Sequence, residues 1–152
     1  MAILDSKLEL CDAQNLASTT TSGVHVGNII DLGATGKDGW GNSLVESPGE
    51  GGQVYLNINV NTVLSAHAPN VCLMTDSALA SSAMASAVEI ARILLPASSP
   101  AGHRSTISVP TGGMLRYVQI KVVAGHNSQT GKLDIWLSDN PGDSQIPTAA
   151  LK

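Results

Sequence analysis

Residues 53–66, QVYLNINVNTVLSA, alternate between apolar and polar side chains along most of their length. The apolar positions are Val54, Leu56, Ile58, Val60 and Leu64, with Thr62 in the gap. The positions between them hold Tyr55, Asn57, Asn59 and Asn61. Because successive side chains of a strand point to opposite faces, this pattern predicts a β-strand with one apolar face and one polar, uncharged face.

Other stretches show the same alternation on a smaller scale. Residues 116–124 and 133–137 both alternate, and the polar loop 125–131 between them has a glycine at each end, so we expect the two strands to form a hairpin. Further runs typical of strands cover residues 7–10, 24–32, 71–74 and 105–109. Seven or eight short strands separated by Gly, Pro, Asn and Ser turns predict an all-β fold. The expected architecture is an antiparallel jelly-roll sandwich of about eight strands in a single domain, residues 1–152.

The segment from Asp76 to Leu95 permits two interpretations. Its alanines and leucines recur at helical spacing after a possible N-cap at Asp76 or Ser77, which predicts a short helix within residues 77–91. Its second half, residues 88–94, also alternates and is compatible with a strand. Local sequence alone leaves both interpretations open.

Composition excludes several classes of function. The 152 residues are 43% hydrophobic but only 13% charged, against about 25% charged in typical domains. A net charge of -4 does not suit a nucleic-acid-binding protein, which needs a basic face, so no nucleic-acid partner is expected. The sequence has no apolar run of the roughly 20 residues that a membrane helix requires, so no membrane partner is expected either.

The N-terminus carries Asp5, Lys7 and Glu9 where a signal peptide would be apolar, so we expect the protein to be made and kept in a cytoplasm. The two cysteines, Cys11 and Cys72, are then expected to be reduced and buried as small apolar side chains.

Charge is almost absent from a long central part of the chain. From Gly51 to Val88 the only formally charged residue is Asp76. Either the strands in this region are central and covered, or their polar face contacts another protein. A neutral but solvated face would explain the same observation.

Sequence motifs for catalysis are absent. No two of the four histidines have the spacing of a local metal-binding pair, and the chain lacks a G-x-S-x-G nucleophile elbow, a P-loop and an HExxH motif. The turn from Asp139 to Asp143 offers two carboxylates that could bind calcium, although an Asn-Pro-Gly turn capped by aspartates explains the same residues and is favoured. We expect no cofactor and no enzymatic activity.

Four segments taken in order carry a resemblance to a known family. They are residues 3–14 (ILDSKLELCDAQ), 28–33 (NIIDLG), 115–120 (LRYVQI) and 133–137 (LDIWL). Their order and spacing resemble the capsid cement, or decoration, proteins of tailed bacteriophages, of the Bordetella-phage type. The chain departs from that family in its glycine-rich stretch, residues 33–52, and in its Ala/Ser stretch, residues 76–91. Because the family tends to have strand, loop and strand in the second region, the resemblance favours strands there over a helix.

The resemblance implies a structural virion protein made in the host bacterial cytoplasm. Such a protein has a jelly roll with an N-terminal arm (about residues 1–22), binds the outer surface of the capsid, bridges neighbouring major capsid proteins and has no catalytic residues. It also associates with itself, and a homodimer is favoured over a trimer. The side chains that we expect at its interfaces are Leu4, Leu8, Trp40, Tyr55 and Trp136.

Two other functions remain open at this point. A carbohydrate- or receptor-binding jelly roll could use Trp40 together with a calcium site at Asp139 and Asp143. A small hydrolase could assemble a site from residues that are distant in the sequence.

Overall fold

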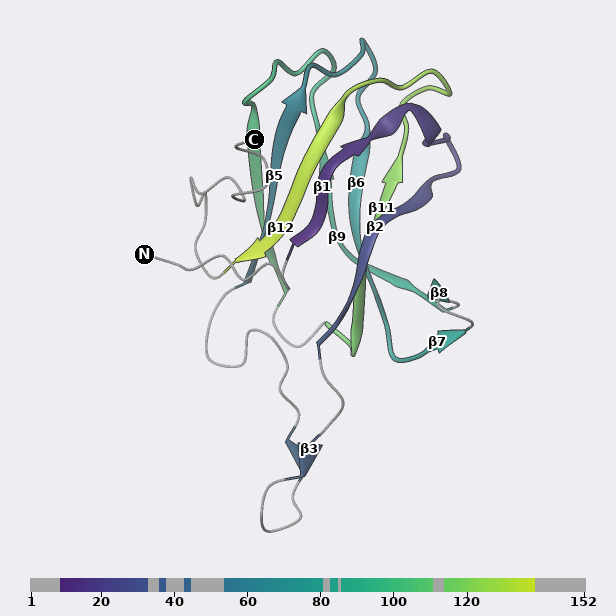
Figure 1. Ribbon diagram of the computed structural model, residues 1–152, viewed down its shortest axis with the longest axis vertical. Coiled ribbons are helices and arrows are strands. Elements are labelled where there is room, and N and C mark those ends of the chain that lie inside the picture. The colour runs from purple at the N-terminus through teal and green to yellow at the C-terminus, as the bar shows by residue number, and fades with distance from the viewer. Residues whose placement is uncertain are drawn as a thin grey trace.

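Two four-stranded antiparallel sheets face each other across the apolar core (Figure 1). The computed structural model describes residues 9–32, 36–37, 43–44, 54–80, 83–84, 86–110 and 114–138. Sheet A has the order β1 (Glu9–Asn15), β12 (Lys132–Ser138), β5 (Val54–Thr62), β10 (Arg104–Val109). Sheet B has the order β2 (Val24–Asp31), β11 (Tyr117–Val123), β6 (Asn70–Asp76), β9 (Val88–Leu94). The predicted all-β antiparallel sandwich is therefore confirmed.

Short elements extend from the two sheets. A 3₁₀ turn, Leu16–Ser18, follows β1. Strands β3 (Gly36–Lys37) and β4 (Ser43–Leu44) pair with each other, and so do β7 (Leu79–Ala80) and β8 (Ala83–Met84). Figure 1 shows both small hairpins at the lower end of the sandwich. The described residues include no helix with the length and hydropathy of a membrane-spanning segment.

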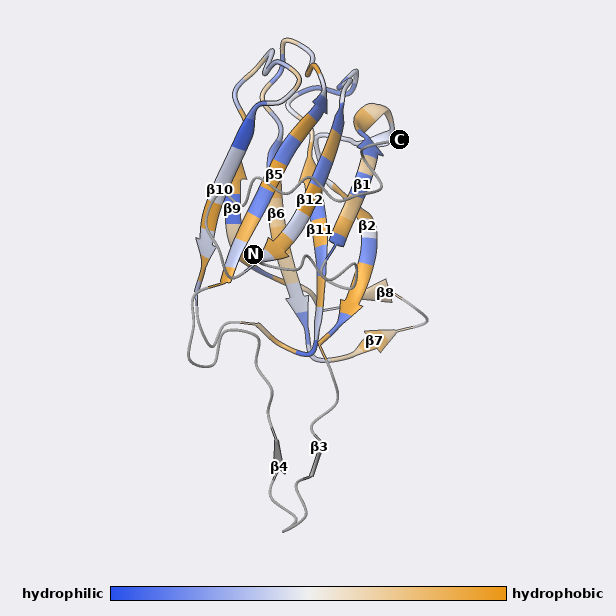
Figure 2. Ribbon diagram, turned by 60° about the vertical axis from the view of Figure 1, so that its left-hand side comes forward, coloured by the Kyte–Doolittle hydropathy of each residue, from blue (hydrophilic) through white to orange (hydrophobic). Residues whose placement is uncertain are grey.

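The core is aliphatic, as the sequence without phenylalanine requires. Apolar residues alternate with polar ones along the strands (Figure 2), and the apolar residues of both sheets form one buried cluster. The four central strands contribute most of the fully buried core residues, and Leu10, Leu16 and Leu95 are equally buried. The members from the central strands are Leu56, Ile58, Val60, Val71, Leu73, Val118, Ile120, Val122, Leu133, Ile135 and Leu137. Both cysteines are buried and free, as expected.

The charge-poor central part of the chain forms strands in the middle of both sheets. Strand β5 lies between β12 and β10, and β6 lies between β11 and β9. For β5 and β6, most of whose residues are buried, the interpretation as central and covered strands is confirmed. It does not hold for loop 63–69 or for the β7–β8 hairpin, which are partly or largely exposed.

The predicted hairpin between residues 116–124 and 133–137 is wrong. Both segments are strands, but β11 belongs to sheet B and β12 to sheet A, so the connection between them crosses from one sheet to the other. Alternation cannot distinguish these arrangements, because each strand turns its apolar face to the core in either case.

The helix predicted within residues 77–91 is also wrong, and the strand interpretation is confirmed for the described part of that segment. Strand β9 pairs with β6 from Val88 to Leu94, and β7 and β8 precede it. Pairing with a central strand outweighs the helix preference of alanine and leucine, which amounts to a few tenths of a kcal/mol per residue.

The two long sides of the sandwich differ. Strands β1 and β2 approach so closely that a Cβ at Gly27 would overlap the carbonyl oxygen of Leu10 and the thiol of Cys11. On the other side, within the part of the chain that the structure describes, β9 pairs only with β6 and β10 only with β5, so these are the outer strands of their sheets there. Residues 9–22 of the predicted N-terminal arm form β1 and its connection to β2, while residues 1–8 lie outside the described residues.

Candidate functional site

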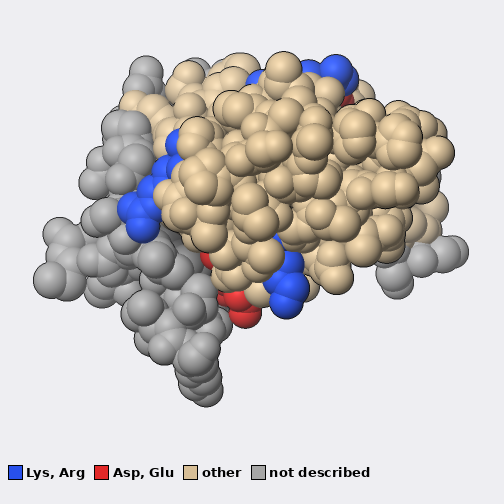
Figure 3. Space-filling view, turned by 90° about the horizontal axis from the view of Figure 1, so that it is seen from above, with Lys and Arg blue, Asp and Glu red and all other residues tan. Residues whose placement is uncertain are grey.

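Four loops gather at one end of the sandwich and form a surface without formal charge. They are residues 16–23, 63–69, 95–103 and 124–131, and each connects a strand of one sheet to a strand of the other. None of these segments contains Asp, Glu, Lys or Arg. Figure 3 looks down on this end and shows a broad neutral surface with a few charged side chains at its margin. We call this surface the loop end.

Backbone hydrogen bonds fasten the four loops to one another. Bonds between loops include those from Ser98 N to Ser65 O (2.9 Å), from Leu64 N to Ser99 O (3.0 Å), from Ser65 N to Thr130 O (3.2 Å) and from Ala124 N to Thr20 O (2.9 Å). Because each loop bonds to at least one neighbour, the loop end is a connected surface and not a set of independent turns.

Side chains add further bonds within the loop end. The His67 and His126 rings stack with centroids 4.6 Å apart. Gln129, which is 1% exposed, donates from Nε2 to the carbonyl oxygen of His67 over 3.2 Å, and its backbone N–H donates to the carbonyl oxygen of His126. These contacts join loop 63–69 to loop 124–131 through side chains as well as through the backbone.

Most exposed side chains of the loop end are small, and the larger exceptions include Val63, His126 and Asn127. Ala17, Ala66 and Ala101 are exposed, each in a different loop. Interface cores in protein complexes are depleted in charged residues, since burying an unpaired charge is costly. A connected surface of mostly small side chains, without Asp, Glu, Lys or Arg, is therefore suited to contact with another protein.

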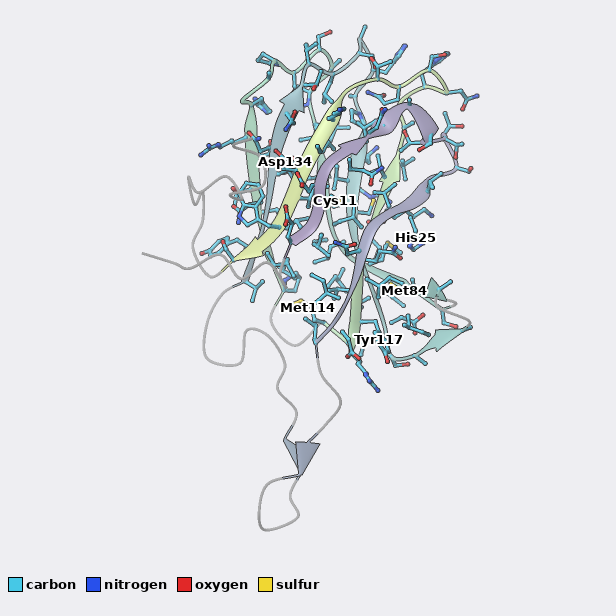
Figure 4. The ribbon with its side chains drawn as sticks, in the orientation of Figure 1. Cys11, His25, Met84, Met114, Tyr117 and Asp134 are labelled. Atoms are coloured by element: carbon cyan, nitrogen blue, oxygen red, sulfur yellow. The ribbon has the colours of Figure 1, made fainter. Side chains whose placement is uncertain are left out.

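Polar side chains line the outer face of sheet A, and most of them are buried. Asp134 is 0% exposed, and its carboxylate accepts hydrogen bonds from Asn59 Nδ2 at 3.0 Å and from Asn61 Nδ2 at 3.4 Å. Next to this group, Asn57 Nδ2 donates to Ser138 Oγ at 2.8 Å. Figure 4 shows Asp134 on β12, next to β1, which carries Cys11. This network fixes the polar faces of β5 and β12 against each other.

The structure places two of the predicted interface residues on this face. Trp136 is directly opposite Asn57, and Tyr55 is directly opposite Ser138. Trp136 is only 1% exposed, so it is not presented to a partner, and the expectation of an exposed anchor at this position is corrected. The outer face of sheet A carries polar residues, but at Asn57, Asp134 and Ser138 it is buried. Alternation with apolar residues therefore places Trp136 on this face without exposing it to solvent. Tyr55 is partly exposed.

The remaining predicted site residues fall outside the described residues. This holds for Leu4, Leu8 and Trp40 of the expected interface and for the calcium candidates Asp139 and Asp143. Among the described residues, no three His, Cys, Asp or Glu side chains are arranged to hold a metal ion.

The two thiols are chemically quiet at neutral pH. Burial, with a smaller contribution from Glu9, raises the pKa of Cys11 to about 12. Burial, with a smaller contribution from Glu89, raises the pKa of Cys72 to about 11. Since the thiolate is the nucleophilic and metal-binding form, neither side chain is activated for that chemistry.

A serine on β10 lies close to a histidine that directly precedes this strand. Ser105 Oγ lies 3.3 Å from His103 Nε2. Within the part of the chain that the structure describes, no hydrogen bond joins His103 to a carboxylate, which would orient the imidazole as a general base. This contact does not amount to a catalytic triad.

Sequence reasoning did not find the loop end. The sequence does contain four turn segments without charged residues. Only the fold shows that these segments lie together and form one surface. Compared with models of protein families and with curated proteins, the chain matches none.

Proposed function

We propose that the protein is a structural component of a tailed-bacteriophage virion, a cement protein that binds the outer surface of the capsid and bridges neighbouring major capsid proteins. The loop end, a neutral surface held together by backbone hydrogen bonds, is the observation that carries this proposal. In this role the loop end contacts the shell, and the protein acts through shape and copy number instead of reactive groups.

The strand arrangement supports the jelly-roll part of the proposal. Successive long strands alternate between sheet A and sheet B, except for β6 and β9, which are neighbours in sheet B. Two sheets of four strands with connections that cross between them are expected for a jelly roll, which consists of two Greek keys. The resemblance segments 28–33, 115–120 and 133–137 fall mainly on β2, β11 and β12, and β2 pairs with β11.

The physical benefit of such a protein comes from linkage. A ligand that binds only the assembled, expanded shell stabilises that state by mass action. Many weak contacts on one shell then add up, because each bridging molecule engages two neighbouring subunits. A rigid neutral surface suits this task, since little conformational entropy is lost when it docks.

The test measures binding to expanded, undecorated capsids of the parent phage. We expect the protein to co-sediment with the shells and to raise the temperature at which they disrupt. The variants Ala17→Lys, Ala66→Lys and Ala101→Lys place a charge in three loops of the loop end, and each should weaken binding about tenfold or more, since a buried unpaired charge costs at least 1.4 kcal/mol.

A matched control places the same charge at the opposite end of the sandwich. Ser77 is exposed and directly follows β6, so Ser77→Lys should bind the shells as the unchanged protein does. Absence of binding by the unchanged protein would refute the proposed function. Equal binding by all four variants would show that the loop end is not the contact surface.

A further inference from the structure

Strand β9 is an outer strand with unusual exposed apolar side chains. Leu94 and Val88 are 60% and 57% exposed, the two highest values among the large apolar residues that the structure describes. They lie at the two ends of β9, whose only backbone partner in the described residues is β6. An unpaired strand edge of this kind can accept a strand of another chain.

A β-bulge divides β9 into two halves. Leu73 of β6 is opposite Ala91, but the next residue, Met74, is opposite Glu89. One step along β6 therefore corresponds to two steps along β9, and Ile90 is the additional residue.

The bulge places an acidic and a basic residue on the same face of β9. Glu89 and Arg92 are three residues apart, so in a regular strand their side chains would point to opposite faces. Here both point away from the core, and Arg92 donates from Nε and Nη2 to the two carboxylate oxygens of Glu89 at 2.8 and 2.7 Å.

The other face of β9 is turned toward the core. Its residues Val88, Ala91 and Ile93 are opposite Thr75, Leu73 and Val71 of β6.

This arrangement makes the edge of β9 complementary to itself. When two copies of β9 run antiparallel about a two-fold axis between Ile90 and Ala91, Glu89 of each copy is opposite Arg92 of the other. Val88 is then opposite Ile93, and Leu94 is opposite Ala87. Residues opposite each other in an antiparallel pair must share a face, and the bulge is what satisfies this condition for Glu89 and Arg92 together with Val88 and Ile93.

We propose that β9 is the contact of a two-fold symmetric dimer, in which sheet B of one copy continues through β9 of a second copy into a single eight-stranded sheet. The charges of the two edges are complementary, and the contact covers the two most exposed large apolar side chains. A symmetric contact of this type uses the same patch on both copies. The inference deepens the self-association that belongs to the proposed function. Because β9 leads into loop 95–103 and the paired strands run antiparallel, the loop ends of the two copies point in opposite directions.

The first test exchanges charges in the purified full-length chain. In a dimer of Glu89→Arg, residues 89 and 92 of the two copies would bring four cations together, and in a dimer of Arg92→Glu they would bring four anions together. Each variant should therefore be monomeric by native mass spectrometry at concentrations where the unchanged protein is a dimer. An equimolar mixture of the two variants restores opposite charges at both crossings and should form a heterodimer. Circular dichroism of each variant checks that the sandwich has folded.

The controls reverse charge on the opposite side of the sandwich. Asp12 and Lys132 are exposed on β1 and β12, and Asp12→Lys and Lys132→Glu should remain dimeric. A monomeric unchanged protein, dimeric single variants, or a folded mixture that forms no heterodimer would each overturn the proposal.

The second test reads the register directly. A mixture of Leu94→Cys and Ala87→Cys should form a disulfide-linked heterodimer under mild oxidation, whereas Leu94→Cys alone should not, because the two copies of residue 94 lie at opposite ends of the pairing. The native thiols are buried and do not compete. Cross-linking of Leu94→Cys with itself but not with Ala87→Cys would refute this register. Both tests use the protein alone, so a dimer that binds no capsid refutes only the proposed function, and a monomer that binds capsids refutes only the dimer.

Discussion

The backbone N–H of Ala13 donates a hydrogen bond of 2.8 Å to the carboxylate of Asp134 and joins the irregular part of β1 to β12. Ala13 has a φ of 44°, in the left-handed region that residues other than glycine adopt only with strain. The second oxygen of the same carboxylate accepts from Asn59 and Asn61 of β5. One buried side chain therefore connects three strands of sheet A and holds the irregular turn of β1.

Asp134→Ala should lower the free energy of unfolding by about 3 kcal/mol, because several donors at a buried position lose their acceptor. Urea unfolding followed by circular dichroism measures this change. Asp12→Ala is the matched control, since Asp12 is an exposed carboxylate of β1, and it should change stability by less than about 0.5 kcal/mol. Equal effects of the two substitutions would show that the carboxylate of Asp134 does not hold the strands together.

The stability of the protein should depend on pH through Glu9, in the direction opposite to that of a carboxylate held in an ion pair. Burial, and to a smaller extent the carboxylates of Asp12 and Asp134, raise the pKa of Glu9, and its buried Oε1 atom has no hydrogen-bond partner among the described residues. The folded state then binds this proton more tightly than the unfolded state. Stability should fall as the pH rises from the ordinary value of 4.5 through the raised pKa, and it should stay lower at neutral pH.

Glu9→Gln removes the ionised form and should therefore stabilise the protein at pH 7 and flatten this part of the pH profile. Thermal unfolding at several pH values between 4 and 8 compares the variant with the unchanged protein. A variant that is less stable at pH 7, with an unchanged pH profile, would contradict the assignment.

Much of the sandwich could be predicted from the sequence, because each long strand has one face in the core and alternates accordingly. The period of β5, from Val54 to Thr62, predicts its faces correctly, but it does not tell which strands are its neighbours. For the same reason alternation predicts a hairpin of β11 and β12, whereas the two strands lie in different sheets, since short connections occur within sheets and between them.

The candidate site was harder to predict than the fold. Trp136 occupies a polar-face position in the sequence and is nevertheless buried, because burial of that face depends on the rest of the fold. The loop end combines segments up to about a hundred residues apart, and the bulge at Ile90 changes which side chains of β9 share a face. Neither property is expressed in local periodicity.

Asp76 anchors the base of the β7–β8 hairpin, and its removal should release that hairpin. Its carboxylate accepts hydrogen bonds from the backbone N–H groups of Ala78 at 3.1 Å and Ser86 at 2.8 Å, and these bonds lower the pKa of Asp76. In Asp76→Ala the two amides should exchange with solvent faster, which hydrogen exchange by NMR measures, while the amides of β6 and β11 keep their protection. Ser77→Ala, at the neighbouring exposed position, should leave both rates unchanged.

The carboxylate of Asp76 also makes the stability of the fold depend on pH in a defined direction. Because its pKa is lower in the folded state, Asp76 stabilises the protein above its ordinary pKa of 3.8, and this contribution is lost as the pH falls through the lowered value. The exchange rates of Ala78 and Ser86 should therefore rise, relative to those of other amides, below about pH 4. Rates that follow the general pH dependence of amide exchange would refute this role.

The close approach of β1 and β2 depends on Gly27, and Gly27→Ala should test it. The residue has a φ of 71°, and a Cβ there would overlap the backbone oxygen of Leu10 and the Sγ atom of Cys11. Left-handed strain costs about 1–2 kcal/mol, and displacement of backbone adds to it, so the variant should lose about 3 kcal/mol or more of stability.

Gly102 is the matched control, because it separates strain from crowding. Its φ is 84°, but no atom of the described residues lies within 4 Å of a Cβ built there. Gly102→Ala should therefore cost only the backbone strain, about 1 kcal/mol. Urea unfolding of both variants measures the difference. If the two substitutions cost the same, β1 and β2 separate without penalty, and the contact between these strands does not close this side of the sandwich.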